Sequence, residues 1–171
     1  MPRAVHQLEG HAVAQRLNAA LSGIVLNATD EWVEVDPRRI VEALRWLRDD
    51  DDLDAAQLSC LTAVDRYDRF EVVYWLQSLD NNHQIEVKAI LEDHDEPSLP
   101  SCYPVYTGAL LQELETYDLM GIRFEGHPDL KRLFLWEGFP GFPLRKDFLK
   151  LEGRFPGLPG FPYEEKGVQV R

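Results

Sequence analysis

The sequence is poor in cysteine, in long apolar runs and in glycine-rich phosphate-binding patterns. Its two cysteines, Cys60 and Cys102, cannot supply the full set of thiolates that an iron–sulfur cluster needs. No stretch approaches the roughly 18 consecutive apolar residues of a membrane-spanning helix, and residues 1–11 lack an apolar secretory core. We therefore expect a cytoplasmic chain without its own cluster or membrane span, and both cysteines buried as small apolar residues.

Positive charge is scarce and unevenly placed. The net charge is −12, but residues 1–120 hold 9 Lys and Arg against 23 Asp and Glu, whereas residues 121–171 hold 9 against 7. Binding to nucleic acid needs concentrated Lys and Arg, and an anionic membrane surface attracts basic segments. The charge pattern therefore predicts neither nucleic-acid binding nor direct docking on a membrane.

Residues 1–120 carry the periodicities of a small α+β domain. Apolar residues recur at helical spacing over 11–21, 37–48 and 105–120, and Asp36-Pro37 is a favourable helix start. Short β-rich runs occupy 24–26, 32–35, 57–64, 70–79 and 84–91, the last three joined by polar turns. We predict a small, mostly antiparallel sheet with helices packed on it. The acidic run 49–52 lacks the glycine and glutamate of a calcium loop, so we interpret it as solvated.

Residues 121–171 differ in composition and are predicted to form an extended, irregular arm. They hold 8 of the 11 glycines and 6 of the 11 prolines, with no sustained helical or strand period. Exposing their large apolar side chains would cost roughly 1.5–3 kcal/mol apiece, so we expect the arm to lie across another subunit. These side chains are Phe124, Leu130, Leu133, Phe134, Leu135, Trp136, Phe139, Phe142, Phe148 and Phe155.

Carboxylates gather at the end of the last predicted helix, where Gly121 suits a left-handed helix end. Glu113, Glu115 and Asp118 lie near the negative pole of the helix dipole. An acid/base pair is one interpretation, but ion pairing is favoured because cations follow closely. The pairs are predicted either within the chain or with the arginines of a partner. The cations are Arg123, Lys131, Arg132, Arg145 and Lys146.

Two further motifs admit a chemical and an architectural interpretation. His127, before Pro128, is a candidate metal ligand or general base, but the other histidines show no metal spacing to it, so a structural turn is favoured. Arg145-Lys146-Asp147 resembles a phosphate patch without a glycine-rich loop. We favour an interface clamp, whose direction of approach Gly141, Pro143 and Leu144 would set. No catalytic, cofactor-binding or metal-binding residue is predicted.

The segment from Glu113 to Phe148 also carries a family resemblance. ELETYDLMGIRFEGHPDLKR, followed after a short gap by GFPLRKDF, resembles the signature of the 30-kilodalton subunit of proton-pumping NADH:quinone oxidoreductase, respiratory complex I, which is designated C in bacteria and J in cyanobacteria. Leu114 stands where the family usually has Arg, and Phe142 where it usually has His or Trp. The matching positions are Glu113, Glu115, Tyr117, Asp118, Gly121, Ile122, Phe124, Gly126, His127, Pro128, Leu130, Arg132, Gly141, Pro143, Leu144, Arg145, Lys146, Asp147 and Phe148.

The resemblance implies a scaffold that binds no cofactor of its own. FMN and the iron–sulfur clusters would reside in partner subunits. It implies packing on the hydrogenase-like quinone-site subunit, near the terminal iron–sulfur cluster subunit, as a peripheral part of a complex on the cytoplasmic side of a cell or thylakoid-type membrane. The short chain is closer to the compact cyanobacterial form, so ferredoxin is an alternative donor to NADH. The interface residues implied are Glu113, Glu115, Tyr117, Asp118, Gly121, His127, Pro128, Arg132, Pro143, Leu144, Arg145, Lys146 and Asp147.

Two alternatives stay open at this point. One is the equivalent subunit of a membrane-bound hydrogenase, which shares this module. The other is a stand-alone enzyme that uses His127 and the helix carboxylates.

Overall fold

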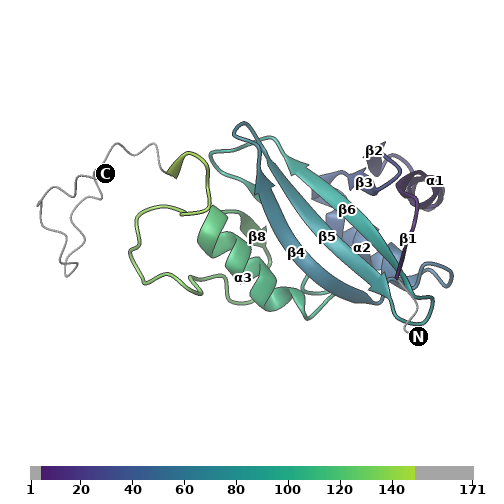
Figure 1. The fold of residues 1–171 in the computed structure, drawn as a ribbon. Helices are drawn as coiled ribbons and strands as arrows, with labels where there is room; N and C mark the ends of the chain where they lie inside the picture. Colours follow the sequence, from purple (N-terminus) through teal and green to yellow (C-terminus); the bar gives the residue numbers. More distant parts are fainter. Residues whose placement is uncertain (1–4, 149–171) are drawn as a thin grey trace, which may run out of the picture.

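The computed structural model describes residues 5–148, which form a mixed sheet, three α-helices and a returning segment (Figure 1). The elements, in chain order, are β1 (His6–Gln7), α1 (Gly10–Ala20), β2 (Val25–Ala28), β3 (Trp32–Val35), a 3-10 turn (Pro37–Arg39), α2 (Ile40–Asp49), β4 (Gln57–Asp65), β5 (Phe70–Ser78), β6 (His83–Leu91), β7 (Ser98–Pro100), α3 (Ala109–Met120) and β8 (Arg123–Glu125). The α+β class predicted from the sequence is confirmed.

The main sheet has the strand order β2-β3-β6-β5-β4, with β1 paired to one end of β6. Strands β4, β5 and β6 form the expected antiparallel meander, whereas β3 runs parallel to β6. The connection through α2 therefore runs from β3, in the interior of the sheet, to β4, at the edge of the sheet. In Figure 1 the meander faces the viewer and α2 lies behind it.

The start of the second helix follows the predicted capping chemistry. The Asp36 carboxylate accepts a hydrogen bond from the Arg38 backbone N–H at 2.9 Å, and Pro37 occupies the first turn. The first turn is a 3-10 turn, and α2 proper begins at Ile40. Its buried face, which includes Ile40, Leu44 and Leu47, packs on the sheet.

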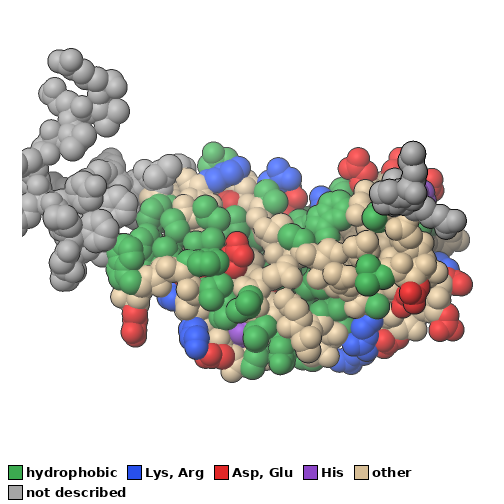
Figure 2. Space-filling model, turned by 60° about the horizontal axis from the view of Figure 1, so that its bottom comes forward, with side chains coloured by type: hydrophobic (Ala, Val, Ile, Leu, Met, Phe, Trp, Pro, Cys, Tyr) green, Lys and Arg blue, Asp and Glu red, His purple; other side chains and the backbone are tan. Residues whose placement is uncertain are grey.

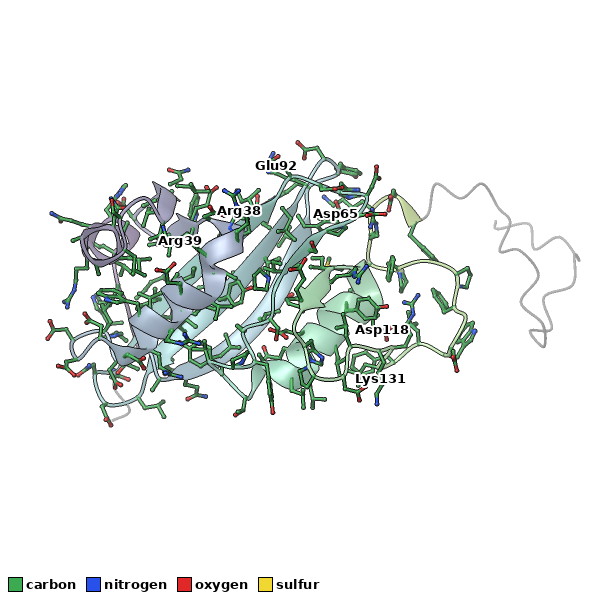
Figure 3. The ribbon with its side chains drawn as sticks, turned by 180° about the vertical axis from the view of Figure 1, so that it is seen from behind. Arg38, Arg39, Asp65, Glu92, Asp118 and Lys131 are labelled. Atoms are coloured by element: carbon green, nitrogen blue, oxygen red, sulfur yellow. The ribbon has the colours of Figure 1, made fainter. Side chains whose placement is uncertain are left out.

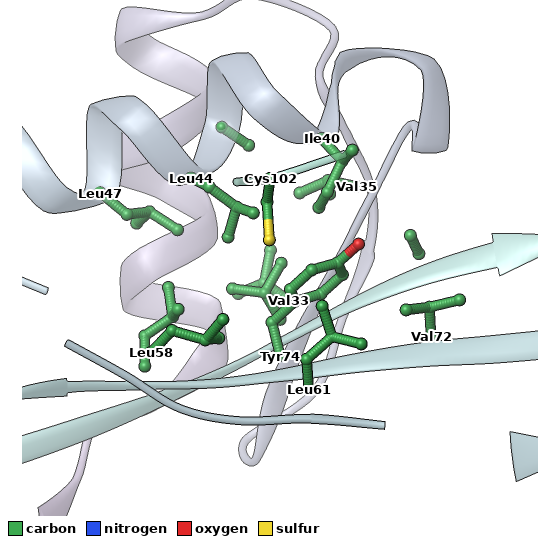
Figure 4. Packing of buried hydrophobic residues seen from close by; sticks show 14 of the residues in the cluster. Val33, Val35, Ile40, Leu44, Leu47, Leu58, Leu61, Val72, Tyr74 and Cys102 are labelled. Carbon is green, nitrogen blue, oxygen red and sulfur yellow. The ribbon is translucent and has the colours of Figure 1, made fainter. Parts of the chain in front are cut away.

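The core lies between α1, α2 and the inner face of the sheet. Alternate residues of β6, such as Ile85, Val87 and Ala89, are buried, as the period of two predicts. Figure 4 shows Leu44 and Leu47 of α2 facing Tyr74 of the sheet, with the Cys102 side chain among them.

The two cysteines have different environments. The prediction of burial is right for Cys102, which is buried, and wrong for Cys60, which is exposed. Cys60 follows a β-bulge and pairs with Trp75, so its side chain lies on the outer face, away from α2.

The packed fold continues beyond residue 120, where the sequence indicated the start of the arm. The chain turns at Gly121, Ile122 and Phe124 enter the core, and β8 pairs in parallel with β7. Each of these strands has only three residues, and β7 ends in Pro100. Segments this short show no alternation of apolar and polar residues that would predict a strand. The irregular segment therefore begins after Glu125 and not at residue 121, as the sequence predicted. Phe155 lies outside the described residues.

Candidate functional site

The segment that follows α3 folds back over the end of that helix. Gly121 takes the left-handed conformation, φ 79°, and its N–H donates to the Tyr117 carbonyl at 2.8 Å. The ring of Phe142 packs on the glycine so closely that a Cβ there would lie 2.6 Å from it. Position 121 thus needs glycine both for its backbone angle and for the ring it receives.

Asp118 anchors the first half of this segment. Its side chain is 0% exposed, and Oδ2 accepts hydrogen bonds from three consecutive backbone N–H groups, those of residues 133, 134 and 135, at 3.1, 2.7 and 2.9 Å. The Arg132 guanidinium donates to Oδ1 at 3.1 Å. We call these contacts the Asp118 anchor. A buried carboxylate with this many donors holds a chain reversal in one conformation.

Arg132 joins the Asp118 anchor to a later part of the returning segment, residues 139–142. One nitrogen donates to the Asp118 carbonyl at 2.7 Å, and the other donates to the carbonyls of Phe139 and Gly141 at 3.2 and 3.0 Å. The guanidinium also lies over the Phe142 ring, 4.8 Å from its centre. A single arginine therefore connects the helix end with residues 139–142.

The electrostatics agree with an ionised Asp118. Burial alone would raise the pKa of the Asp118 carboxyl, but the N–H groups of residues 133–135 and the Arg132 guanidinium together hold that pKa below its ordinary value.

A second carboxylate, Asp65 at the end of β4, anchors the last part of the segment. Asp65 accepts hydrogen bonds from the backbone N–H groups of Tyr67 at 2.7 Å and Lys146 at 2.9 Å, and it pairs with the His94 ring at 3.1 Å. Arg145 donates to the His94 carbonyl at 2.6 Å and to its Nδ1 at 2.9 Å. We call this group the Asp65 anchor. Figure 3 shows Asp65 and Asp118 at the end of the molecule where the segment folds back.

Aromatic contacts complete the Asp65 anchor. The His94 ring stacks on Phe70 at 4.6 Å, the Arg145 guanidinium lies 5.3 Å from the Phe70 ring centre, and the Lys146 ammonium lies 4.4 Å from that of Tyr67. Burial tends to raise the pKa of Asp65, but the N–H groups of Lys146 and Tyr67, together with His94, bring it below the ordinary value.

Between the two anchors, residues 133–144 form a loop with a largely apolar surface, which we call the docking loop. Phe134 is 64% exposed, Trp136 45% and Leu144 56%, and Leu133 is also exposed. Figure 2 shows hydrophobic side chains gathered at this end of the molecule.

The rings of the docking loop also pack on one another. Trp136 packs edge-on against Phe139, and Phe139 stacks on Phe148. Large aromatic side chains held in a fixed loop, yet exposed to water, are typical of a protein interface.

The three helix carboxylates predicted from the sequence have different environments. Ion pairing is right for Asp118 and wrong for Glu113, whose oxygens accept hydrogen bonds from the Ser101 hydroxyl at 2.6 Å and the Cys102 N–H at 2.7 Å. The side chain of Glu113 points into the domain, where these two bonds hold the turn that precedes α3. Glu115 is exposed on α3 and Tyr117 is half-buried against Phe142.

His127 forms the structural turn that the sequence favoured. Its Nε2 lies 3.0 Å from the Leu110 carbonyl, which can only accept, and its Nδ1 lies 3.1 Å from the Asp129 N–H, which can only donate. These bonds select the neutral tautomer with the proton on Nε2. The next residue, Pro128, is exposed.

The predicted clamp residues are fixed by their own chain. The side chain of Arg145 is only 10% exposed because His94 and Asp147 hold it. Pro143 is half-buried between Phe142 and Leu144 in the segment. Whether these residues also contact a partner stays a prediction.

Asp65 and His94 were not predicted as site residues from the sequence. They lie about 50 to 80 residues before the returning segment that they hold, and they carry no local signal.

Within residues 5–148, no group of His, Cys, Asp and Glu has a metal-binding arrangement. No helix in that range is long and apolar enough to cross a membrane.

The fold and the site define a small α+β domain that presents a preformed apolar loop. The family model of the respiratory-chain NADH dehydrogenase 30 Kd subunit matches residues 33–154, so the chain belongs to this family.

The chain is similar to the C-type subunits of NADH-quinone oxidoreductase from several bacteria. It is 43% identical over 147 residues to that of Roseiflexus sp. (strain RS-1), covering 82% of this chain and 84% of the relative. It is 46% identical over 117 residues to the C-type protein numbered 2 of Rhizobium etli (strain CIAT 652), covering 67% of this chain but only 62% of that relative. The chain thus spans less than two thirds of the Rhizobium protein.

Among solved structures, the fold is similar to a chain of the membrane-bound sulfane sulfur reductase, an archaeal respiratory membrane complex. The TM-score is 0.67 at 20% identity, covering 92% of this chain and 98% of the other. At this identity the similarity concerns the fold alone.

Proposed function

We propose that this chain is a non-catalytic scaffold subunit of a proton-translocating NADH:quinone oxidoreductase, with ferredoxin as an alternative donor. The observation that carries the proposal is the docking loop, which exposes Phe134 and Trp136 and is held near its two ends by two buried carboxylates. Because the loop is already ordered, binding a partner costs little conformational entropy. Family membership supports the assembly to which the loop belongs.

The partner proposed for the docking loop is the hydrogenase-like quinone-site subunit, near the subunit that carries the terminal iron–sulfur cluster. FMN and the clusters reside in partner subunits, and this chain lies at the cytoplasmic side of the membrane as a peripheral component.

The stand-alone enzyme is less well supported. Both ring nitrogens of His127 bond backbone groups, so neither is left to take a proton from a substrate. Of the three helix carboxylates of that hypothesis, Glu113 and Asp118 are buried with their hydrogen bonds made inside the chain, and Glu115 is exposed on α3.

The proposal is tested by co-expression with the quinone-site subunit and a measurement of affinity. The Phe134→Ser, Trp136→Ser double variant should bind tenfold more weakly or worse, because aromatic anchors carry most interface energy. The control is Leu26→Ser, which changes a residue with 58% exposure on β2, at the opposite edge of the sheet. Unchanged binding by the double variant, or equal weakening by the control, would refute the proposed surface.

A second candidate is the equivalent subunit of a membrane-bound hydrogenase-type complex. The fold shared with a chain of the archaeal respiratory membrane complex favours keeping it. Affinity measured against the quinone-site subunit and against a hydrogenase large subunit, both from the same organism as this chain, would distinguish the two assemblies.

A further inference from the structure

The Asp65 anchor contains a histidine whose protonation state is set by its neighbours. The Arg145 guanidinium can only donate, so His94 Nδ1 must accept the bond between them, and Nε2 must then carry the proton that it donates to Asp65. The bonded arrangement is therefore possible only for the neutral imidazole.

A second proton on His94 would face the Arg145 guanidinium directly. The Nδ1–H would replace an acceptor by a donor 2.9 Å from a cation. The Asp65 carboxylate on the other side would still pair with the ring, and more strongly. Protonation thus strengthens one contact within the domain and breaks one of the contacts with the returning segment, leaving the bonds from Arg145 to the His94 carbonyl and from the Lys146 N–H to Asp65 to hold it alone.

We propose that Asp65, His94 and Arg145 form a proton-controlled latch, which holds the segment around Lys146 while His94 is neutral and releases it when His94 is protonated. The charged groups that contact the ring are Asp65 from β4 and Arg145 from the segment. Arg145 also pairs with Asp147, and Asp93 and Asp95 are the chain neighbours of His94. Phe70 covers one ring face and is neutral.

The Lys146 backbone N–H reports the state of the latch. It donates to Asp65 Oδ2 at 2.9 Å when the latch is closed and becomes free to exchange when the segment leaves. Asp65 itself stays ionised in the relevant pH range, because its pKa lies below the ordinary value. A change between about pH 7.5 and 5.5 therefore reports on histidine and not on the carboxylate.

The latch is tested by hydrogen exchange of a peptide covering residues 142–148 in the full chain, corrected for the pH dependence of intrinsic exchange. Protection should fall roughly tenfold between about pH 7.5 and 5.5, the range in which histidine side chains generally change charge, because a protonated ring can no longer accept the bond from Arg145. In His94→Gln the side-chain amide offers one donor and one acceptor without titrating, so protection should persist at both pH values.

The matched control is His11→Gln, which changes an exposed histidine on α1 and should keep the wild-type response. The latch is refuted if wild-type protection changes less than twofold, if His94→Gln responds to pH like the wild type, or if that variant is unprotected throughout. Because only the isolated chain is used, the outcome is independent of the proposed partner.

Discussion

The two ends of the Glu113–Asp118 stretch of α3 show how differently a buried carboxylate can be used. Both side chains are fully buried. Glu113 faces the domain and accepts from a hydroxyl and one N–H, whereas Asp118 faces the returning segment and accepts from three N–H groups and an arginine. Burial dominates at Glu113 and raises its pKa, while the donors outweigh burial at Asp118 and lower its pKa. The number and charge of the donors thus decide whether the pKa of a buried carboxyl is raised or lowered.

The largest effect is expected for Asp118→Ala. The substitution leaves three backbone N–H groups and the Arg132 guanidinium without their acceptor in a buried place, so the free energy of unfolding should fall by about 3–5 kcal/mol. Urea denaturation measures it, with Asp129→Ala, an exposed acid paired to Lys131, as the control. A loss for Asp118→Ala no larger than that for the control would mean that the anchor is not structural.

A smaller effect is expected where the segment meets the helix end. Gly121→Ala forces a Cβ into the Phe142 ring and a side chain into left-handed backbone, with an expected cost of about 1–3 kcal/mol. Gly126→Ala is a matched control, because its φ of 82° is similar but nothing lies within 4 Å of the added Cβ. The difference between the two, measured by denaturation, isolates the ring contact, and equal costs would show that the ring moves freely.

The pH dependence should have opposite signs at the two carboxylates. The pKa of Asp118 is lowered on folding, so its contribution to stability is present above about pH 4 and is lost as the pH falls further. The pKa of Glu113 is raised, so the folded state binds that proton more tightly and its contribution declines as the pH rises above its ordinary value.

Glu113→Gln should therefore change stability by no more than about 1 kcal/mol near pH 7. Its stability relative to the wild type should be greatest at neutral pH and decrease toward pH 5. Urea midpoints measured at several pH values check this, and a difference with no pH trend would contradict the assignment of a raised pKa to Glu113.

The smallest stability effect is expected on the docking loop. Phe134→Ser should alter the free energy of unfolding by about 0.5 kcal/mol or less, because most of the side chain is already in water. Thermal denaturation measures it, with Phe142→Ser as the half-buried counterpart that should cost more. Equal losses would show that the exposed ring also supports the fold.

The parts of the fold set by local chemistry could be predicted from the sequence. The Asp36-Pro37 helix start, the end of α3 at Gly121 and the meander all depend on neighbouring residues. Ion pairing at the acidic end of α3 was also predicted, either within the chain or with a partner, and the structure shows that Arg132, 14 residues later, pairs with Asp118.

The Asp65 anchor could not be predicted because its members meet only through the sheet topology. Asp65 ends an edge strand, His94 follows the next strand but one, and Arg145 arrives after α3. Likewise, nothing local indicates that Arg145 turns toward its own chain, since a Lys- and Arg-rich turn fits an internal or an external carboxylate equally well.

The two cysteine thiols differ in their access to water, and the bulge in β4 precedes the exposed one. Burial raises the pKa of Cys102 well above its ordinary value, so this thiol stays protonated and enclosed, whereas Cys60 opens to water beside Trp75 on the outer face of the sheet. A maleimide dye added to the native protein should therefore attach at Cys60 alone. The molecule thus carries a natural, single-site attachment point on the side opposite α2.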